Sequence, residues 1–343
     1  MTPAEALLAW YDSHRRELPW RDIGNPYATW VSEIMLQQTR AETVIPYFQR
    51  FMADYPTVEA LAAAPLDDVL KHWEGLGYYS RARNLHRGAQ RVAAEYGGVL
   101  PRTPEALRRI EGIGDYTAGA IASIALGQKA AAVDGNVIRV ISRFTGLREN
   151  AALPAVKREI AARTEALMPD DRPGDFNQAL MDLGATVCVP GTPDCGACPL
   201  AAGCAARLLD IAAELPVLPK AKKPRVLCWD VLLIRSGDRV LVRRRTENML
   251  RGLWVFPMAE GFAAPSEIRA AAKEKTGLDC VRIADCGAAR HVFTHQIWEM
   301  HLWQMETDPG TEAGSPWCFV TEAELDALAL PTAMKAAREK AFG

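Results

Sequence analysis

The region of residues 1–205 shows the spacing of apolar residues that is typical of amphipathic helices. Apolar residues recur there every three or four positions, and Pro and Gly residues separate the repeats into short units. Helices are predicted at residues 57–64, 67–73, 81–96, 103–110 and 136–146. A succession of short helices predicts one compact all-α domain, which we place at residues 1–213.

The pattern changes after residue 213. Residues 214–225, ELPVLPKAKKPR, contain three Pro and four basic residues, and we interpret them as a linker. Strand-like runs follow at 227–234, 239–242, 253–257, 292–304 and 317–320, and helical patterns at 266–275 and about 322–340. A Ser-Gly-Asp turn between the first two runs predicts a hairpin. Residues 226–343 are therefore expected to form a small α+β domain.

Composition places the chain among ordinary globular proteins. Of its 343 residues, 49% are hydrophobic and 24% are charged, which excludes a disordered chain, a collagen-like fibre and a disulfide-rich miniprotein. No stretch approaches the ~18 apolar residues that a membrane span needs, and the N-terminus lacks the basic segment of a signal peptide. We therefore expect a cytoplasmic protein that is not bound to membranes. The net charge of −2 excludes nucleic-acid binding through bulk charge alone but allows a local basic surface.

Four of the eight Cys residues lie within 17 residues, which indicates a set of metal ligands. They are Cys188, Cys195, Cys198 and Cys204, with the spacing C-x6-C-x2-C-x5-C. Such thiolates can hold a zinc ion or an iron–sulfur cluster. The spacing favours the cluster, because zinc ribbons usually present two C-x2-C pairs and this segment has one. A cluster here could carry electrons or could hold its loop rigid.

Residues 104–126 predict two helices joined by a tight turn. Gly112 and Gly114 flank an Ile in this turn. Backbone N–H groups at the start of the second helix, an apolar run over residues 118–126, can bind a phosphate together with the helix dipole. A plain hairpin of two helices without a ligand is the alternative.

Two carboxylic acids lie in contrasting sequence surroundings. Glu33 has Trp30 and Leu36 at i−3 and i+3 of a predicted helix, so desolvation should raise its pKa and make it a candidate proton donor. Asp134 occupies an N-cap position, where N–H groups and the helix dipole favour its ionised form. One acid and one carboxylate are the equipment for breaking a glycosidic bond. A solvated Glu and a plain helix cap are the alternatives.

The Gly-rich turn and the Cys spacing together resemble the helix-hairpin-helix DNA glycosylases of the endonuclease III type. Four segments, WVSEIMLQQT, GLGYYSRARNL, GIGDYTAGAI and VDGNVIRV, narrow this resemblance to the MutY-type adenine DNA glycosylases. It covers nearly the whole chain, including a C-terminal Nudix-like domain. It implies a monomeric base-excision repair enzyme that removes adenine mispaired with 8-oxoguanine or guanine in double-stranded DNA. It also implies a [4Fe–4S] cluster on the loop of residues 188–204.

The resemblance implies roles for individual residues. Glu33 would protonate adenine at N7, and Asp134 would stabilise the sugar cation or its covalent adduct. Tyr116 occupies the position of the Schiff-base lysine of bifunctional relatives, which implies an enzyme without efficient lyase activity. The remaining implied residues are Asn136, with Tyr116, in the sugar pocket; Trp20, Arg21 and Leu36 at the flipped adenine; Gln38 and Tyr78 in the base stack; Gly112 and Gly114 at a phosphate; and Phe293, Thr294 and His295 beside 8-oxoguanine.

Two departures from the family pattern change what we expect. Glu111 and Asp115 place acidic groups around the hairpin, which should weaken phosphate binding there. Residues 261–278 retain only two of the glutamates that a Nudix hydrolase needs, so nucleotide hydrolysis is not expected. A regular strand through residues 293–295 is the alternative to a lesion-reading loop. The alternative functions are a bifunctional glycosylase/lyase for oxidised bases, a non-catalytic lesion-binding protein and an electron-transfer protein.

Overall fold

The computed structural model describes residues 1–219 and 223–342, which form two compact units. Unit 1 comprises Met1–Ala63 and Asn84–Lys220, and unit 2 comprises Ala64–Arg83 and Ala221–Gly343. Unit 2 therefore includes a segment that the helical pattern assigns to the N-terminal domain. Residues 220–222 of the predicted linker lie outside the described residues, and the first strand already begins at Arg225. The domain boundaries that the sequence predicts at residues 213 and 226 therefore stay predictions.

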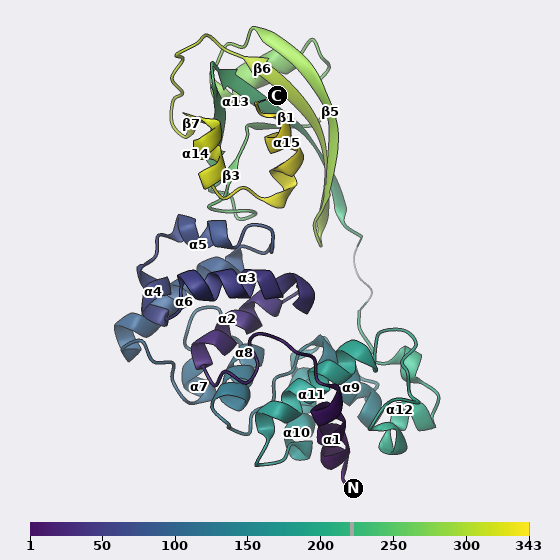
Figure 1. Cartoon of the computed structure of the whole chain (residues 1–343). Coiled ribbons are helices and arrows are strands. Elements are labelled where there is room, and N and C mark those ends of the chain that lie inside the picture. Colours follow the sequence, from purple (N-terminus) through teal and green to yellow (C-terminus); the bar gives the residue numbers. More distant parts are fainter. Residues whose placement is uncertain (220–222, 343) are drawn as a thin grey trace. The chain divides into compact units, whose positions relative to one another are not determined.

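Unit 1 is built from short helices (Figure 1). Its helices are α1 (Pro3–His14), α2 (Pro26–Leu36), α3 (Ala41–Asp54), α4 (Val58–Ala63), most of α6 (Ser80–Tyr96), α7 (Pro104–Leu107), α8 (Asp115–Ala120), the π-helix η1 (Ile121–Ala125), α9 (Gly135–Thr145), α10 (Pro154–Leu167), α11 (Pro173–Thr186), η2 (Ala201–Gly203), α12 (Ala205–Leu208) and η3 (Ala212–Glu214). Helices α1, α2, α7, α10 and α11 begin with Pro, whose fixed φ and missing N–H suit the first helical position. The predicted all-α character of this region is confirmed.

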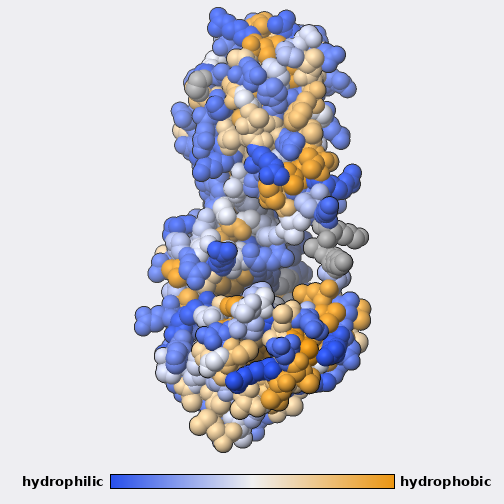
Figure 2. All heavy atoms as spheres, turned by 90° about the vertical axis from the view of Figure 1, so that its right-hand side faces the viewer, coloured by the Kyte–Doolittle hydropathy of each residue, from blue (hydrophilic) through white to orange (hydrophobic). Residues whose placement is uncertain are grey.

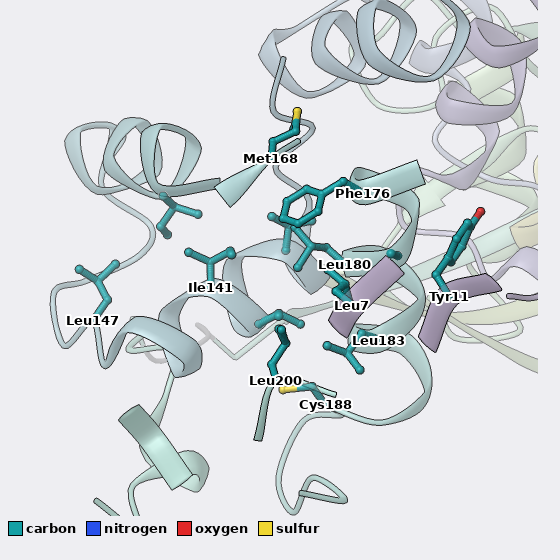
Figure 3. Close-up of a cluster of buried hydrophobic side chains, with 14 of the residues drawn as sticks. Leu7, Tyr11, Ile141, Leu147, Met168, Phe176, Leu180, Leu183, Cys188 and Leu200 are labelled. Carbon is teal, nitrogen blue, oxygen red and sulfur yellow. The ribbon is translucent and has the colours of Figure 1, made fainter. Parts of the chain in front are cut away.

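Two buried regions of unit 1, the core around α11 and the helix α2, hold candidate functional side chains in place. Helix α11 packs against α1, α9 and η1, and the apolar core between these helices includes Leu7, Ile141, Leu180 and Cys188 (Figure 3). Helix α2 is buried along nearly its whole length, from Tyr27 to Met35. A polar residue on α2 is therefore forced into the interior of the unit.

The hairpin between α7 and α8 departs from the sequence prediction at its second helix. The turn itself is as expected, because Gly112 has φ +83°, a value that L side chains rarely adopt. However, α8 ends at Ala120 and continues as the π-helix η1, so the prediction of one regular helix over residues 118–126 is wrong. A Cβ on Gly119 would lie 2.0 Å from the carbonyl oxygen of Ala131, which shows how closely a following segment packs here. Single π-helical turns of this kind are frequent at functional sites.

Unit 2 contains a mixed sheet with helices on both faces (Figure 1). Its elements are α5 (Leu66–His72), the start of α6, β1 (Arg225–Ser236), β2 (Arg239–Arg244), β3 (Trp254–Val255), β4 (Met258–Glu260), α13 (Ile268–Thr276), β5 (Arg282–Val292), β6 (Gln296–Glu306), β7 (Trp317–Val320), α14 (Glu322–Ala327), η4 (Thr332–Met334) and α15 (Lys335–Lys340). The strand order is β3-β2-β1-β6-β5; β4 also pairs with β1, and β7 with β2. Strands β1 and β6 are parallel, and the other pairs are antiparallel.

Both faces of this sheet are covered by apolar side chains. Val231 and Leu233 of β1 belong to a core that includes residues of α14 and α15, whereas Leu232 and Ile234 belong to a core with α13. Alternate residues of a strand point to opposite faces, so the continuous apolar run of β1 fits a strand buried on both sides. The predicted α+β character is confirmed.

Two predicted elements of unit 2 are wrong. The single strand over residues 292–304 is instead a hairpin, because β5 ends at Val292 and β6 begins at Gln296. The single helix over residues 322–340 is divided into α14, η4 and α15, and Pro331 lies at the division, where Pro cannot continue a helix. The hairpin matters for function because it places residues 293–295 in a connection between strands.

The described residues contain no helix that is both long enough and apolar enough to cross a membrane. On the face that Figure 2 shows, hydrophilic residues cover most of the surface and apolar residues form local patches. Exposed large apolar side chains include Leu208 and Leu209 at the end of α12. The polarity of the drawn face agrees with the balanced composition.

Candidate active site

A small pocket in unit 1 collects side chains from distant parts of the sequence. The segment between α1 and α2 contributes Arg16, Trp20 and Arg21, α2 contributes Glu33 and Leu36, η1 contributes Ile124, and α11 contributes Gln178 and Met181. The cavity has a volume of about 50 Å³. A purine base is larger than this, so a base can enter only when the walls move apart. The pocket brings together four of the predicted residues: Trp20, Arg21, Glu33 and Leu36.

Glu33 is the acidic group of this pocket and is only 4% exposed. The Tyr116 hydroxyl donates a hydrogen bond to its Oε2. The pKa of Glu33 is raised to about 7, mainly by burial and also by the charge of Asp134, whereas the Tyr116 hydrogen bond and Arg21 lower it. A substantial fraction of Glu33 is therefore protonated near neutral pH, as the sequence predicts for a proton donor.

Tyr116 lies in the first turn of α8, directly after the hairpin. Burial raises the pKa of its hydroxyl well above the usual value, and the neighbouring Glu33 and Asp134 raise it as well. The hydroxyl therefore stays protonated at neutral pH and acts as a hydrogen-bond donor to Glu33.

Asp134 caps the N-terminus of α9, as predicted. Its Oδ1 accepts a hydrogen bond from the Val137 N–H at 2.7 Å, and its Oδ2 accepts one from the Asn136 amide at 2.9 Å. Burial raises the pKa of Asp134, whereas these two donors and Arg139 lower it, so the predicted effect of the N–H groups is present but is outweighed by desolvation. The helix dipole and the N–H groups therefore offset only part of the desolvation.

Asn136 is held between the cap and the neighbouring helix. Its Oδ1 accepts a hydrogen bond from Arg139 at 2.8 Å, and Arg139 also donates to the Gly184 carbonyl at 2.6 Å. A Cβ on Gly184 would lie 2.6 Å from the Asn136 Cβ, so Gly184 lets α11 approach α9 closely. Tyr116, Asp134 and Asn136 thus meet beside Glu33 although they lie far from it in sequence.

Sequence reasoning missed several residues of this pocket. Arg16, Gln178 and Met181 line it, and the Asp182 carboxylate pairs with both Arg16 and Arg21. One signal was present in the sequence: Asp182 is a charged residue inside the apolar pattern of α11, and fully buried charges are almost always paired.

Two predicted base-stack residues share an unusual backbone conformation. Gln38, directly after α2 in unit 1, has φ +59°, and Tyr78, before α6 in unit 2, has φ +47°. Left-handed φ values are uncommon for residues other than Gly and are frequent at functional sites. Both side chains are exposed, Tyr78 to 45%. Exposure and conformation agree with side chains that protrude from the surface.

In unit 2, the structure brings Tyr78 together with the predicted Phe-Thr-His triplet. The hydroxyl groups of Tyr78 and Thr294 form a hydrogen bond. Phe293 packs edge-on against His291, with ring centroids 4.4 Å apart, and against Trp298. A cavity of about 450 Å³ is lined by Tyr78, His291, Phe293, Thr294 and His295, among others. Residues that are more than 200 positions apart in sequence therefore form one local site.

The predicted phosphate site at the hairpin carries acidic side chains, as the sequence indicates. Gly114 is the N-cap of α8, with extended backbone. Asp115 is 94% exposed and lies 3.5 Å from Arg108, and Glu111 lies 3.5 Å from Arg91. These ion pairs partly offset the negative charge around the turn.

The four predicted cysteine ligands lie in the loop after α11, and all are free thiols. Burial raises the pKa of Cys198 to about 11, and the other three thiols raise it further, so the four lie within electrostatic range of one another. Arg143 donates to the Cys188 Sγ at 3.4 Å. Within residues 1–219 and 223–342, no group of three or more His, Cys, Asp or Glu side chains is arranged to hold a metal ion. A soft, thiolate-rich set next to a cation fits a sulfur-ligated cluster in its chemistry.

Comparisons with known proteins agree with this architecture. Residues 31–166 match the HhH-GPD superfamily base excision DNA repair protein family, and residues 230–340 match the NUDIX domain family. The chain is similar to the adenine DNA glycosylase of Mus musculus, with 35% identity over 96% of this chain and 76% of that protein. The Homo sapiens protein of the same name is also 35% identical, over 96% of this chain and 72% of that protein. The predicted fold class, a helix-hairpin-helix domain followed by a Nudix-like domain, is confirmed.

Solved structures show the same fold for the helical part. A thermostable thymine-DNA glycosylase matches with a TM-score of 0.55 and 32% identity, over 60% of this chain and 95% of that chain. An endonuclease III in a trapped covalent complex with DNA matches with a TM-score of 0.52 and 23% identity, over 61% of this chain and 95% of that chain. The second likeness concerns the fold alone.

Proposed function

Because the chain belongs to the adenine DNA glycosylase family, we propose that it removes adenine mispaired with 8-oxoguanine or guanine from double-stranded DNA. One observation carries this proposal: Glu33, buried and with a pKa of about 7, accepts a hydrogen bond from Tyr116 and lies within electrostatic range of Asp134. An acid and a second carboxyl group within electrostatic range of it are the groups that glycosidic bond cleavage requires.

The geometry supports a stepwise mechanism. A flipped adenine enters the pocket, and protonated Glu33 gives its proton to adenine N7. The C1′–N9 bond then breaks, and its electron pair leaves with the base. The Asp134 carboxylate stabilises the cationic sugar or forms an adduct with C1′. Water then bonds to C1′, the bond between Asp134 and C1′ breaks where an adduct has formed, and Glu33 accepts the proton from water. An adduct on Asp134 gives net retention of configuration.

The enzyme is proposed to be monofunctional. Tyr116 has no amine for a Schiff base, and its hydroxyl is committed to Glu33. Strand cleavage by β-elimination therefore lacks its usual nucleophile at this position.

We also propose that Cys188, Cys195, Cys198 and Cys204 hold a [4Fe–4S] cluster. The cysteine spacing, the mutual proximity of the thiols and the contact of Arg143 with Cys188 support this. The cluster, when bound, would hold the loop of residues 188–204 in one conformation. Leu200 and Cys188 belong to the core of unit 1, so the loop and the helices support each other.

The proposed division of labour follows the predicted domains. Residues 1–213 would carry catalysis, and residues 226–343 would recognise 8-oxoguanine through Phe293, Thr294 and His295, with Tyr78 inserted into the base stack and Gln38 inserted from unit 1. The protein is proposed to act as a monomer in the cytoplasm. The hydrogen bond between Tyr78 and Thr294 supports a shared role of the inserted and the reading residue.

Single-turnover kinetics on labelled 8-oxoguanine:A and G:A duplexes, with and without hot alkali, test the proposal. Strand breaks that need alkali and form faster opposite 8-oxoguanine are expected. Breaks without alkali would contradict the monofunctional assignment. An iron-replete preparation that binds the duplex but never releases adenine would favour a non-catalytic lesion-binding protein.

A further inference from the structure

Asp182 is a fully buried carboxylate in the middle of α11. Its neighbours Leu180 and Leu183 belong to the apolar core of unit 1, and the Asp182 side chain is only 1% exposed. An ionised group in such a place is unfavourable unless it is paired and hydrogen-bonded. The residues that pair with Asp182 therefore indicate its role.

The two oxygens of Asp182 accept hydrogen bonds from two arginines. Arg21 donates from both terminal nitrogens, at 2.8 Å and 2.9 Å. Arg16 donates from Nε at 2.8 Å and from its backbone N–H at 3.2 Å, and its terminal nitrogen lies 2.7 Å away. Although burial raises the pKa of Asp182, the hydrogen bonds and charges of Arg21 and Arg16 lower it below the usual value. Asp182 is thus ionised at neutral pH.

These contacts fix Arg21 in one orientation beside the catalytic acid. Arg21 also donates to the Arg16 carbonyl at 2.7 Å and lies over the Tyr11 ring, 5.5 Å from its centroid. Both terminal nitrogens are used, whereas the buried Nε has no hydrogen-bond partner among the described residues. A buried donor left unpaired is costly, and Arg21 lines the pocket, so a ligand that enters there could satisfy this N–H.

The pair also sets the charge next to Glu33. The charged or titratable groups that act on Glu33 are Tyr116 from α8, Asp134 before α9 and Arg21 from the segment before α2. Arg21 favours the ionised form of Glu33, which cannot donate a proton. The negative charge of Asp182 lies 2.8 Å from Arg21 and offsets this effect.

We propose that Asp182 is a positioning residue for adenine excision, which holds Arg21 with a free Nε donor at the pocket and balances its charge beside Glu33. Arg16 shares the carboxylate and completes the same wall of the pocket. This role rests on the proposed function, because it concerns the same pocket. The pairing of Asp182 with the two arginines thus orients Arg21 and keeps Glu33 protonated.

The test uses the full-length protein and the 8-oxoguanine:A duplex under single-turnover conditions from pH 5.5 to 9. D182N is expected to lower the rate constant by about 10²-fold, as a misplaced binding group does. It is also expected to move the alkaline limb to lower pH, because the unbalanced Arg21 then favours ionised Glu33. D175N is the matched control: Asp175 lies on the same helix but pairs with Arg172, and its pH limb should equal that of the parent protein.

Two further variants test the charge balance, and R21Q keeps Asp182, so it remains informative if D182N does not fold. R21Q removes the positive charge, so its alkaline limb should move to higher pH than in the parent protein. The double variant D182N/R21Q removes both charges, so its alkaline limb should lie between those of D182N and R21Q. Folded variants whose alkaline limbs all coincide with that of the parent protein would overturn the proposal. A parent protein that releases no adenine would instead refute the proposed function.

Discussion

At the scale of single residues, the proposed excision mechanism depends on the proton that Glu33 holds. E33Q keeps the size and hydrogen-bonding capacity of the side chain but has no acidic proton. We expect it to lower the single-turnover rate by at least 10²-fold, the smaller end of the usual contribution of general acid catalysis. Duplex affinity, measured by fluorescence anisotropy, should stay within about twofold, because Glu33 lies inside the pocket. An unchanged excision rate would rule out the proton-donor role.

The pH dependence of the rate follows from the same residue. Glu33 has a pKa of about 7, so its reactive protonated form is lost as pH rises through that value, and the rate should fall with it. The Tyr116 hydrogen bond lowers this pKa. Y116F removes the bond, so the alkaline limb should move to higher pH in single-turnover profiles.

Tyr27 provides a control for this experiment. Its hydroxyl donates to the Tyr55 carbonyl at 2.9 Å, and it does not line the pocket. Y27F should therefore leave the alkaline limb in place. A limb that moves to lower pH in Y116F would mean that Tyr116 stabilises the protonated rather than the ionised form of Glu33.

At the scale of elements, the sequence correctly predicted those features, such as caps and turns, that depend on only a few neighbouring residues. The cap at Asp134 and the turn at Gly112 are of this kind and were found where the sequence placed them. The sequence could not indicate η1, because its packing involves Gly174 of the distant helix α11, whose added Cβ would lie 2.8 Å from the Ser123 carbonyl oxygen. The raised pKa of Asp134 was missed for a similar reason: burial comes from segments that are distant in sequence.

The close packing of the hairpin against Ala131 can also be tested. In G119A the new Cβ would lie 2.0 Å from the Ala131 carbonyl oxygen, so the backbone has to shift. Overpacking of this kind costs about 1–3 kcal/mol in the free energy of unfolding, which chemical denaturation can measure. G114A is the control, because that Cβ would meet no atom within 4 Å. Equal stability of the two variants would contradict the close packing.

The cysteine loop can be tested through its iron content. C198S removes one of the four proposed ligands, so we expect purified protein to lose most of its iron and its visible absorbance. C280A removes a buried cysteine of unit 2 and should retain iron at the level of the parent protein. Equal iron content in C198S and C280A would contradict the proposed ligand set.

At the scale of the whole molecule, the proposed function assigns lesion recognition to unit 2 and the chemical step to unit 1. All residues of the pocket around Glu33 belong to unit 1, and all residues of the cavity around Thr294 belong to unit 2. A change in unit 2 should therefore alter which mispair is processed without altering the chemical step. Such a separation would explain why the chain carries a Nudix-like domain that lacks the full set of hydrolase glutamates: the domain would recognise the lesion and would not hydrolyse a nucleotide.

Thr294 is the residue at which this separation can be measured. T294A removes a hydroxyl that bonds Tyr78, and a hydrogen bond of this kind contributes about 0.5–1.5 kcal/mol, or up to about tenfold in a rate. We expect T294A to slow excision opposite 8-oxoguanine by up to about tenfold and to leave excision opposite guanine unchanged. T294S keeps the hydroxyl and should preserve the preference. Because the chemical step is common to both duplexes, an equal loss on both in T294A would mean that unit 2 supports catalysis itself rather than lesion choice.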